Sequence, residues 1–359
     1  MKYGIIKKDN LFKTIIDKKA NGGFKVDLKT YTELFDDCGI NVSCVKQFLG
    51  FKHYINYYKL NNRKDWMKLD QAKKQIIKYT GSTEFRGELE GDADFALMFT
   101  LPPEEWYTIK YENTPVNTKS KSGDFIIGWT VDGKPLILNI FETRSILIAG
   151  SSGGGKSSLM NCIIDSLHRS TSKLILDFID LKQVEFSFYN YFPETQYKVS
   201  TTKREAAELL ENVKEEIQHR YAEMESKGLQ KATAEDFPLH VIFIDEYATL
   251  DAVAGTRINS LVSYITAVGR ACNVFMVIAT QHPKNNVIDN TIRANCLSKF
   301  VLACANVAQS NTICGQKIGV ELLGKGDGYA ILDGVVNPIR FQAPLYDDET
   351  RKALYKIVP

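Results

Sequence analysis

Short apolar runs recur through the second two thirds of the chain, and segments of helical length separate them. The runs are five or six residues long and cover 145–149, 174–179, 240–244, 274–279 and 299–304. Runs of this length are typical of strands that are buried on both faces of a parallel sheet. Their alternation with helical segments predicts an α/β domain with a mainly parallel sheet.

The clearest helical pattern covers residues 203–227. Its apolar side chains recur on one stripe, at Ala206, Leu210, Val213, Ile217, Tyr221 and Met224. Thr202 and Glu205 have the spacing of a capping box, in which each residue satisfies a backbone N–H of the other. The pattern therefore predicts a long amphipathic helix with a defined start.

Residues 1–110 have a different pattern, which predicts a small α+β domain. Segments 53–60 and 93–101 have the aromatic and β-branched content of strands. Between them, Trp66, Leu69, Ala72, Ile76 and Ile77 recur at helical spacing. The segment 111–124 is polar, lacks periodicity and contains a proline, so we expect it to link the small domain to a second domain at 125–359.

Charge and cysteine content narrow the class of protein. Residues 1–82 carry 17 basic and 8 acidic side chains, although the whole chain has a formal net charge of only +2. The seven cysteines form no CxxC pair, which is typical of reduced thiols in a cytoplasm and disfavours a structural zinc site. No apolar stretch approaches the about 18 residues of a membrane span. We expect a cytoplasmic protein without a membrane span of its own, recruited to a membrane only through a partner.

Residues 150–157, GSSGGGKS, fit the pattern G-x-x-x-x-G-K-[ST] between a predicted strand and a predicted helix. Backbone N–H groups converge on an anion only where no Cβ blocks its approach, and small residues permit this. We expect Lys156 to reach the β- and γ-phosphates of ATP and the Ser157 hydroxyl to ligate Mg²⁺. The candidate nucleotide-binding residues are Gly150, Ser151, Ser152, Gly153, Gly154, Gly155, Lys156, Ser157 and Ser158.

Polar residues at the ends of two later strands supply candidate catalytic groups. Asp245 is expected to hold Mg²⁺ through water, and Glu246 to polarise the attacking water as a general base. Gln281 is a candidate for sensing the γ-phosphate or orienting that water. The alternatives are a solvated strand end for the acidic pair and an amide that satisfies loop backbone for Gln281. We expect the acidic pair at the tip of a strand neighbouring the one that precedes residues 150–157.

Several segments, in the same order, resemble the FtsK/SpoIIIE family of DNA translocase ATPases in the HerA/FtsK superfamily. Residues 124–157 are similar to the family's strand pair followed by its phosphate-binding loop, and IDLKQVEFSFY is similar to its "IDPK…E…Y" element, with Asp180, Lys182 and Glu185 at matching places. Further similar segments are 215–228, 269–283, 292–296 and 322–332. The resemblance spans about residues 125–332 and implies a RecA-like P-loop NTPase domain.

The resemblance also implies a mechanism and partners. It implies a ring, commonly a homo-hexamer, that threads double-stranded DNA, in transfer of a conjugative plasmid or other mobile element with a membrane-channel or relaxase partner. A neighbouring subunit of such a ring often inserts an arginine at the γ-phosphate. Arg270 is the first candidate and Arg293 the second, the alternative for each being an ion pair with a local carboxylate.

The sequence also departs from the family pattern. His282 stands where the family usually has arginine, so any role of that arginine is in doubt. The family's membrane-spanning N-terminus and winged-helix C-terminal domain have no counterpart, and we do not expect this chain alone to orient itself on specific DNA sequences.

Two other functions share the same superfamily fold. One is an EssC-like protein-export or assembly ATPase, and the other is a viral-type genome-packaging ATPase. A single motor behind a basic domain favours DNA, whose phosphates basic side chains neutralise without reading bases. The basic, aromatic-rich residues 46–68 are better explained as a solvated face than as a DNA contact.

Overall fold

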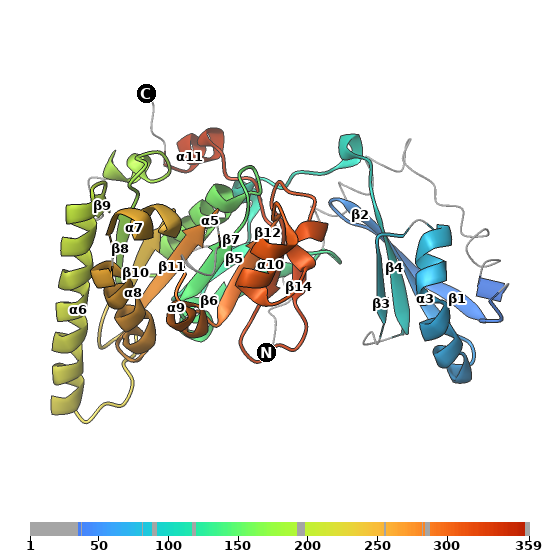
Figure 1. The fold of residues 1–359 in the computed structure, drawn as a ribbon, viewed down its shortest axis with the longest axis horizontal. Helices are drawn as coiled ribbons and strands as arrows, with labels where there is room; N and C mark the ends of the chain where they lie inside the picture. The colour runs from blue at the N-terminus through green and yellow to red at the C-terminus, as the bar shows by residue number, and fades with distance from the viewer. Residues whose placement is uncertain are drawn as a thin grey trace. The chain divides into compact units, whose positions relative to one another are not determined.

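The chain divides into two compact units in a computed structural model. The structure describes residues 35–36, 38–80, 82–87, 92–116, 120–191, 198–254, 256–281, 283 and 288–355, so His282 and residues 1–34 lie outside the described part. The small unit comprises Met1–Thr108 with Val131–Lys134, and the large unit comprises Ile109–Thr130 with Pro135–Pro359 (Figure 1).

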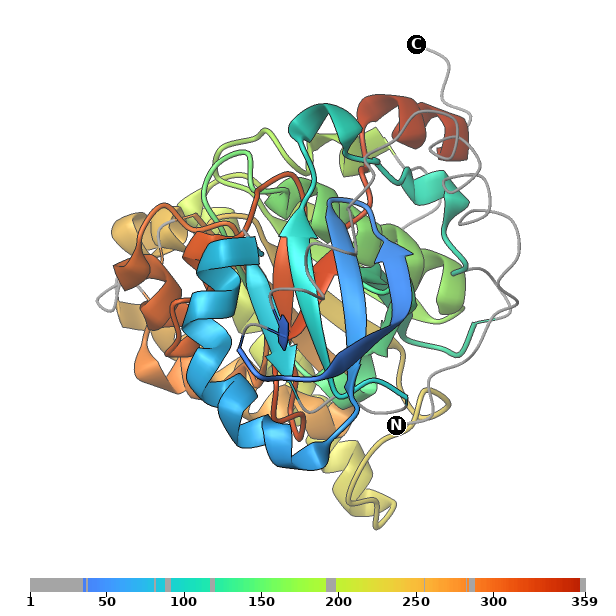
Figure 2. The same cartoon turned by 90° about the vertical axis from the view of Figure 1, so that its right-hand side faces the viewer.

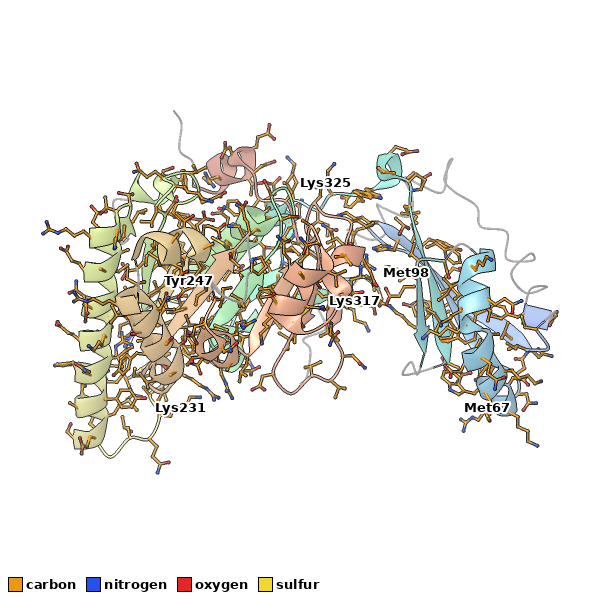
Figure 3. The ribbon with its side chains drawn as sticks, viewed as in Figure 1. Met67, Met98, Lys231, Tyr247, Lys317 and Lys325 are labelled. Carbon is orange, nitrogen blue, oxygen red and sulfur yellow. The ribbon has the colours of Figure 1, made fainter. Side chains whose placement is uncertain are left out.

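The small unit is built on a four-stranded antiparallel sheet of order β1-β2-β4-β3. Its strands are β1 (Val42–Leu49), β2 (His53–Leu60), β3 (Glu84–Gly87) and β4 (Phe95–Thr100). Helix α3 (Trp66–Thr80) packs on one face of this sheet through Leu69 and Ile76 (Figure 2). In Figure 3, Met67 projects from α3, whereas Met98 lies in β4. The predicted strand at 53–60 and the predicted helix are confirmed.

The large unit is built on a ten-stranded sheet. In spatial order its strands are β6 (Pro135–Asn139), β5 (Asp124–Thr130), β14 (Ile339–Gln342), β13 (Asp327–Ile331), β12 (Ser298–Leu302), β7 (Ile146–Ala149), β11 (Val274–Thr280), β10 (Leu239–Ile244), β8 (Leu174–Ile179) and β9 (Lys198–Ser200). Strands β12 to β9 in this order pair in parallel and form the parallel half. Strands β6, β5, β14 and β13 pair antiparallel and form the antiparallel half. The predicted α/β fold with a mainly parallel sheet is confirmed.

Helices cover both faces of the large sheet, which explains why its central strands are continuously apolar. Helix α5 (Lys156–Ser170) packs on the face that includes Ile148 and Phe243. The opposite face, which includes Leu147 and Ile244, is covered by α6 (Lys203–Ser226), α7 (Tyr247–Ala254), α8 (Thr256–Val268), α9 (Asn290–Asn295) and α10 (Val307–Cys314). Successive side chains of a strand point to opposite faces, so a strand with two covered faces has no polar side.

Helix α6 begins with the predicted capping box. The Thr202 hydroxyl accepts a hydrogen bond from the Glu205 N–H, and the Glu205 carboxylate accepts one from the Thr202 N–H. These bonds satisfy two donors that the first turn of a helix leaves unpaired. The start of the helix is therefore set by residues that the sequence already identified.

The segment after residue 108 is joined to the large unit by specific contacts. The Tyr111 side chain is buried, with its hydroxyl 3.0 Å from the Ser166 hydroxyl and its ring 5.1 Å from the ring of Tyr346. Strand β5 follows, and the hydroxyl of Ser170 on α5 donates to the carbonyl of Asp124. Helices α4 (Ile140–Thr143) and α11 (Asp348–Tyr355) complete the α-helices of this unit that the structure describes.

Two expectations about environment can be compared with the structure. All seven cysteines are free thiols. No helix in the described ranges is both long and apolar enough to cross a bilayer.

Candidate nucleotide site

The candidate site lies at the carboxyl ends of the parallel strands. These strands follow the order β12-β7-β11-β10-β8, and β7 leads directly into residues 150–157. The expectation that the acidic pair lies on a strand neighbouring β7 is wrong, because β11 lies between β7 and β10. Periodicity along the chain does not specify the spatial order of strands, and the later strand β11 is inserted at this point.

The phosphate-binding loop, residues 150–157, is braced by two other segments. The N–H and the hydroxyl of Ser151 both donate to the carbonyl of Ala303, each at 2.8 Å. From the other side, the Gly326 N–H donates to the carbonyl of Gly154 at 2.8 Å. The loop is therefore held between the end of β12 and the turn before β13.

The glycines of this loop are required for two different reasons. A Cβ on Gly150 would lie 2.7 Å from the Cβ of Leu302, and one on Gly155 would lie 2.6 Å from the backbone nitrogen of Gly326. A Cβ on Gly153 would meet none of the described atoms within 4 Å, but its φ of +76° favours glycine. Two of these glycines therefore have a role besides the approach of an anion, because packing against the chain itself requires them.

Lys156 joins the loop to the acidic end of β10. Its ammonium group lies 2.6 Å from Asp245 Oδ1 and 2.8 Å from the Asp245 carbonyl oxygen. Both side chains are almost fully buried, so the interaction is only weakly screened by solvent. The structure thus brings together two predicted site residues that are 89 positions apart in sequence.

The first turn of α5 presents donors and hydroxyls with different partners. Gly155, at its N-cap, has a left-handed backbone, and no described side chain caps the helix. Ser157 donates its hydroxyl proton to Glu185 Oε1 at 2.6 Å. Ser158 donates to the carbonyl of Pro344 at 3.0 Å and accepts from the Tyr346 N–H, so its hydroxyl is bonded to the chain itself.

Ser152 lies at the exposed part of the same loop. Helix N-termini attract anions because their first N–H groups lack intrahelical partners and carry partial positive charge. An uncapped start at α5 therefore fits a phosphate.

Glu246 is buried beside Asp245 but has a separate set of partners. Its carboxylate accepts a hydrogen bond from the Thr280 hydroxyl at 2.8 Å and from the Gln281 N–H at 3.1 and 3.2 Å. The Lys182 ammonium lies 3.7 Å from the same carboxylate. Gln281 therefore contacts the proposed base through its backbone, and its half-buried side chain lies at the same strand end.

Sequence reasoning assigned no role to the loop after β8, although the family resemblance marked its residues. The Asp180 carboxylate accepts backbone N–H bonds from Lys182, Val184, Glu185 and Phe186. This loop brings Lys182 to Glu246 and Glu185 to Ser157. The matching positions of the "IDPK…E" element were the signal that could have identified it.

The two candidate arginines lie outside this cluster. Arg270 is exposed in the 3-10 helix η5 (Gly269–Cys272), which precedes β11 and so lies at the opposite edge of the sheet. Arg293, on α9, donates to the Thr312 carbonyl at 2.9 Å and to the Asn290 side chain. Arg270 is therefore not brought to the phosphate-binding loop within one chain, and the described bonds of Arg293 are to α9 and α10.

The residues at the site fit a nucleotide with its magnesium ion. An open glycine at the loop tip, an uncapped helix start and a buried lysine match the needs of phosphate oxygens. Hydroxyl and carboxylate oxygens of Ser157 and Asp245 are the hard ligands that Mg²⁺ prefers. The described residues hold no group of three His, Cys, Asp or Glu side chains suited to a metal. Mg²⁺ usually keeps water and substrate phosphates as its other ligands, which agrees with so few protein carboxylates.

These features define the class of protein. A phosphate-binding loop after a central parallel strand, with an acidic pair two strands away, is the arrangement of a RecA-like P-loop NTPase domain. Residues 110–238 match the model of the FtsK/SpoIIIE family. Over these residues the chain is similar to the FtsK/SpoIIIE family.

Curated proteins show the same similarity. The DNA translocase FtsK of Staphylococcus aureus (strain Mu50) is 32% identical over 256 residues, which are 66% of this chain and 32% of that protein. The DNA translocase FtsK of Listeria monocytogenes is 29% identical over 255 residues, which are 66% of this chain and 34% of that protein. The chain spans about a third of the length of these relatives.

Solved structures share the fold. The pCW3 conjugation coupling protein TcpA, in its monomer form with ATPγS, superposes with a TM-score of 0.62 at 18% identity and covers 91% of this chain and 98% of its own. The cytoplasmic domain of the type VII secretion ATPase EccC from Thermomonospora curvata has a TM-score of 0.57 at 18% identity, over 68% of this chain and 32% of its own. At these identities the matches establish the fold.

Proposed function

We propose that this chain is an ATP-hydrolysing motor that moves double-stranded DNA. The observation that carries the proposal is the 2.6 Å contact between Lys156 and Asp245, which joins the phosphate-binding loop to the acidic pair. The curated relatives are named as DNA translocases, and the match to the family model covers the phosphate-binding loop. The division into a small domain at 1–110, a linker at 111–124 and a motor domain at 125–359 belongs to the same proposal.

The chain's own residues account for binding and water activation. The loop N–H groups and Lys156 bind the phosphates, and Lys156 exchanges part of its contact with Asp245 for phosphate oxygens. Ser157 and, through water, Asp245 would hold Mg²⁺, which would neutralise charge on the phosphates. Glu246 accepts a proton from the attacking water, and the donors Thr280 and Gln281 fix the orientation of its carboxylate.

The proposed assembly is a homo-hexameric ring that completes each site with an arginine from a neighbouring subunit. Arg270 is favoured because it is exposed, whereas the guanidinium of Arg293 is bonded to Thr312 and Asn290 of its own chain. Transfer of a conjugative plasmid or other mobile element is the proposed process. The match to TcpA extends over both units of this chain and over nearly all of TcpA, which supports that process.

A type VII secretion ATPase is the second candidate, because EccC matches the fold with a TM-score close to that of TcpA. Its substrate would be a polypeptide, and DNA would leave the rate of ATP hydrolysis unchanged. The single basic region at residues 1–82 supports DNA, since Lys and Arg neutralise phosphates.

The decisive experiment measures ATP hydrolysis with linear duplex DNA, with single-stranded DNA and without DNA. We expect long duplex DNA to raise the rate, and the stimulation to fall as salt increases. Lys156→Ala should abolish activity, whereas Lys231→Ala, an exposed lysine between α6 and β10, is the matched control and should behave like the parent (Figure 3). A rate that ignores DNA would favour the secretion candidate, and equal activity in Lys156→Ala would overturn the site.

A further inference from the structure

We infer that Glu185 is a positioning residue for Mg²⁺, acting through the hydroxyl of Ser157. Glu185 holds the Ser157 proton, and the serine oxygen thereby presents its lone pairs to the cation. The inference rests on the proposed ATP-binding function and adds a residue to it.

The contact itself sets the direction of the Ser157 hydroxyl. The oxygens of Ser157 and Glu185 are 2.6 Å apart, which is typical of a hydroxyl that donates to an ionised carboxylate. A serine hydroxyl has one proton and two lone pairs. Once the proton points at Glu185, the lone pairs point elsewhere and remain available to a metal.

The loop that carries Glu185 is anchored on both sides. Asp180, which is 1% exposed, accepts four backbone N–H bonds from this loop, one of them from Glu185 itself at 2.9 Å. The next residue, Phe186, is fully buried with its ring 4.9 Å from that of Phe178. In contrast, the side chain of Val184 is 69% exposed. The backbone at Glu185 is therefore held in place, although part of the loop is exposed.

Among the described residues, each side chain of the acidic pair has a lysine partner, whereas Glu185 has no cationic side chain as a partner. Asp245 is paired with Lys156, and Glu246 lies near Lys182. Within the described ranges, Glu185 has no ion pair, and its partner is the neutral Ser157 hydroxyl. A carboxylate of this kind beside the expected metal ligand favours a bound dication.

Glu185 acts through Ser157 rather than as a ligand. No three His, Cys, Asp or Glu side chains of the described residues form a metal cluster, so the protein offers no carboxylate cage at this point. Carboxylates that orient a metal ligand by a hydrogen bond typically contribute about 10- to 100-fold to metal affinity. This range sets the size of the expected effect.

The test measures how Mg²⁺ controls nucleotide binding by the full chain. A fluorescent ATP analogue is bound at increasing Mg²⁺ and followed by anisotropy, for the parent and for Glu185→Gln, which keeps a hydrogen-bond acceptor but loses the charge. We expect the Mg²⁺ concentration for half-maximal binding to rise about 10-fold or more in Glu185→Gln. Affinity measured with EDTA should not fall, because Glu185 acts on the metal ligand Ser157 and not on the phosphates.

Two further variants complete the design. Glu215→Gln, on the exposed side of α6, is the matched control and should leave the Mg²⁺ requirement unchanged. In a Ser157→Ala background, Glu185→Gln should add nothing, because the proton that Glu185 holds is gone. Circular dichroism and thermal unfolding establish that each variant is folded.

The outcomes separate this inference from the proposed function. An unchanged Mg²⁺ requirement in folded Glu185→Gln would overturn the inference while ATP binding by the parent still stands. An equal shift with and without Ser157 would also overturn it, since Glu185 would then act independently of the hydroxyl. A parent chain that binds no ATP analogue would remove the proposed function and this inference together.

Discussion

The two halves of the large sheet carry different kinds of polar residues. In the parallel half, the carboxyl ends of β7, β10 and β11 meet at one edge, where Lys156, Asp245 and Glu246 gather. In the antiparallel half, Arg340 of β14 and Asp327 of β13 form a buried two-point ion pair at 3.1 and 2.8 Å. Parallel strands place all their carboxyl ends on one side, so functional groups from distant segments can converge there, whereas antiparallel strands alternate their ends. We infer that the parallel half carries the catalytic groups, whereas the antiparallel half supports the phosphate-binding loop.

The largest expected effect is in the parallel half. Glu246→Gln should lower the turnover of ATP by about 10²- to 10⁴-fold, because the amide cannot take a proton from water. Nucleotide binding and thermal unfolding should remain close to those of the parent, since glutamine still accepts from Thr280. Steady-state hydrolysis and binding of a fluorescent nucleotide measure both. A loss of stability without a loss of turnover per folded molecule would contradict the division between the halves.

The next largest effect is in the antiparallel half and concerns stability. Arg340→Met removes the guanidinium that pairs with the buried Asp327, and should lower the free energy of unfolding by about 3–5 kcal/mol. Denaturant unfolding of the variant measures this change. Combining it with Asp327→Asn should recover part of the loss, because the buried charge is removed. Unchanged stability in the single variant would show that the pair is not the support inferred for this half.

A smaller effect is expected where the two halves meet. Gly155→Ala would place a Cβ 2.6 Å from the backbone nitrogen of Gly326, at a φ of +104° that disfavours alanine. We expect a loss of about 1–3 kcal/mol in stability together with weaker nucleotide binding. Gly228→Ala is the control, because it has a φ of +65° with no described atom within 4 Å of the added Cβ. Equal losses in both variants would mean that the contact with Gly326 contributes nothing.

The smallest expected effect is a pH dependence of stability, which arises at one of the two edges of the parallel half. At the amino end of β10, His240 is bonded to Glu216 at 2.8 Å and to Asp177 at 3.0 Å, and Arg220 also pairs with Glu216. Burial lowers the pKa of His240, but the bonds to Asp177 and Glu216 outweigh burial, and the pKa is raised above 6.5. Burial raises the pKa of Glu216, but the bond to His240 and the charge of Arg220 outweigh burial. The pKa of Glu216 is therefore lowered.

The sign of the pH effect follows from the raised pKa of His240. The stabilisation is complete below pH 6.5 and is lost as the pH rises through the folded-state pKa. Thermal unfolding from pH 6 to 9 should therefore show a loss of stability that is absent in His240→Gln. A parallel loss in both proteins would assign the effect to other groups.

Local features of the fold were accessible from sequence because they depend on neighbouring residues. The capping box of Thr202 and Glu205 needs only a spacing of three, and the strand before residue 245 needs only an apolar run. The phosphate-binding loop was recognisable because its small residues and lysine are adjacent in the chain.

Contacts between distant segments were not accessible in the same way. Nothing in the pattern indicated that β11 would separate β7 from β10, or that Thr280 would hold Glu246. The pattern also gave no sign that the hydroxyl of Ser158 would bond to Pro344, which lies 186 positions away. Such pairings depend on the packing of the whole sheet and not on any local pattern.

The bracing of the phosphate-binding loop has a consequence for synthesis of the chain. Gly154 and Ser158 are bonded to Gly326 and Tyr346, and the second pair is 188 positions apart. At about 5–20 residues per second, a ribosome needs roughly 10–40 s to produce the residues between them. A nascent chain therefore emerges with its phosphate-binding loop unsupported, and the loop is braced only after the segment that contains Gly326 and Tyr346 has been synthesised.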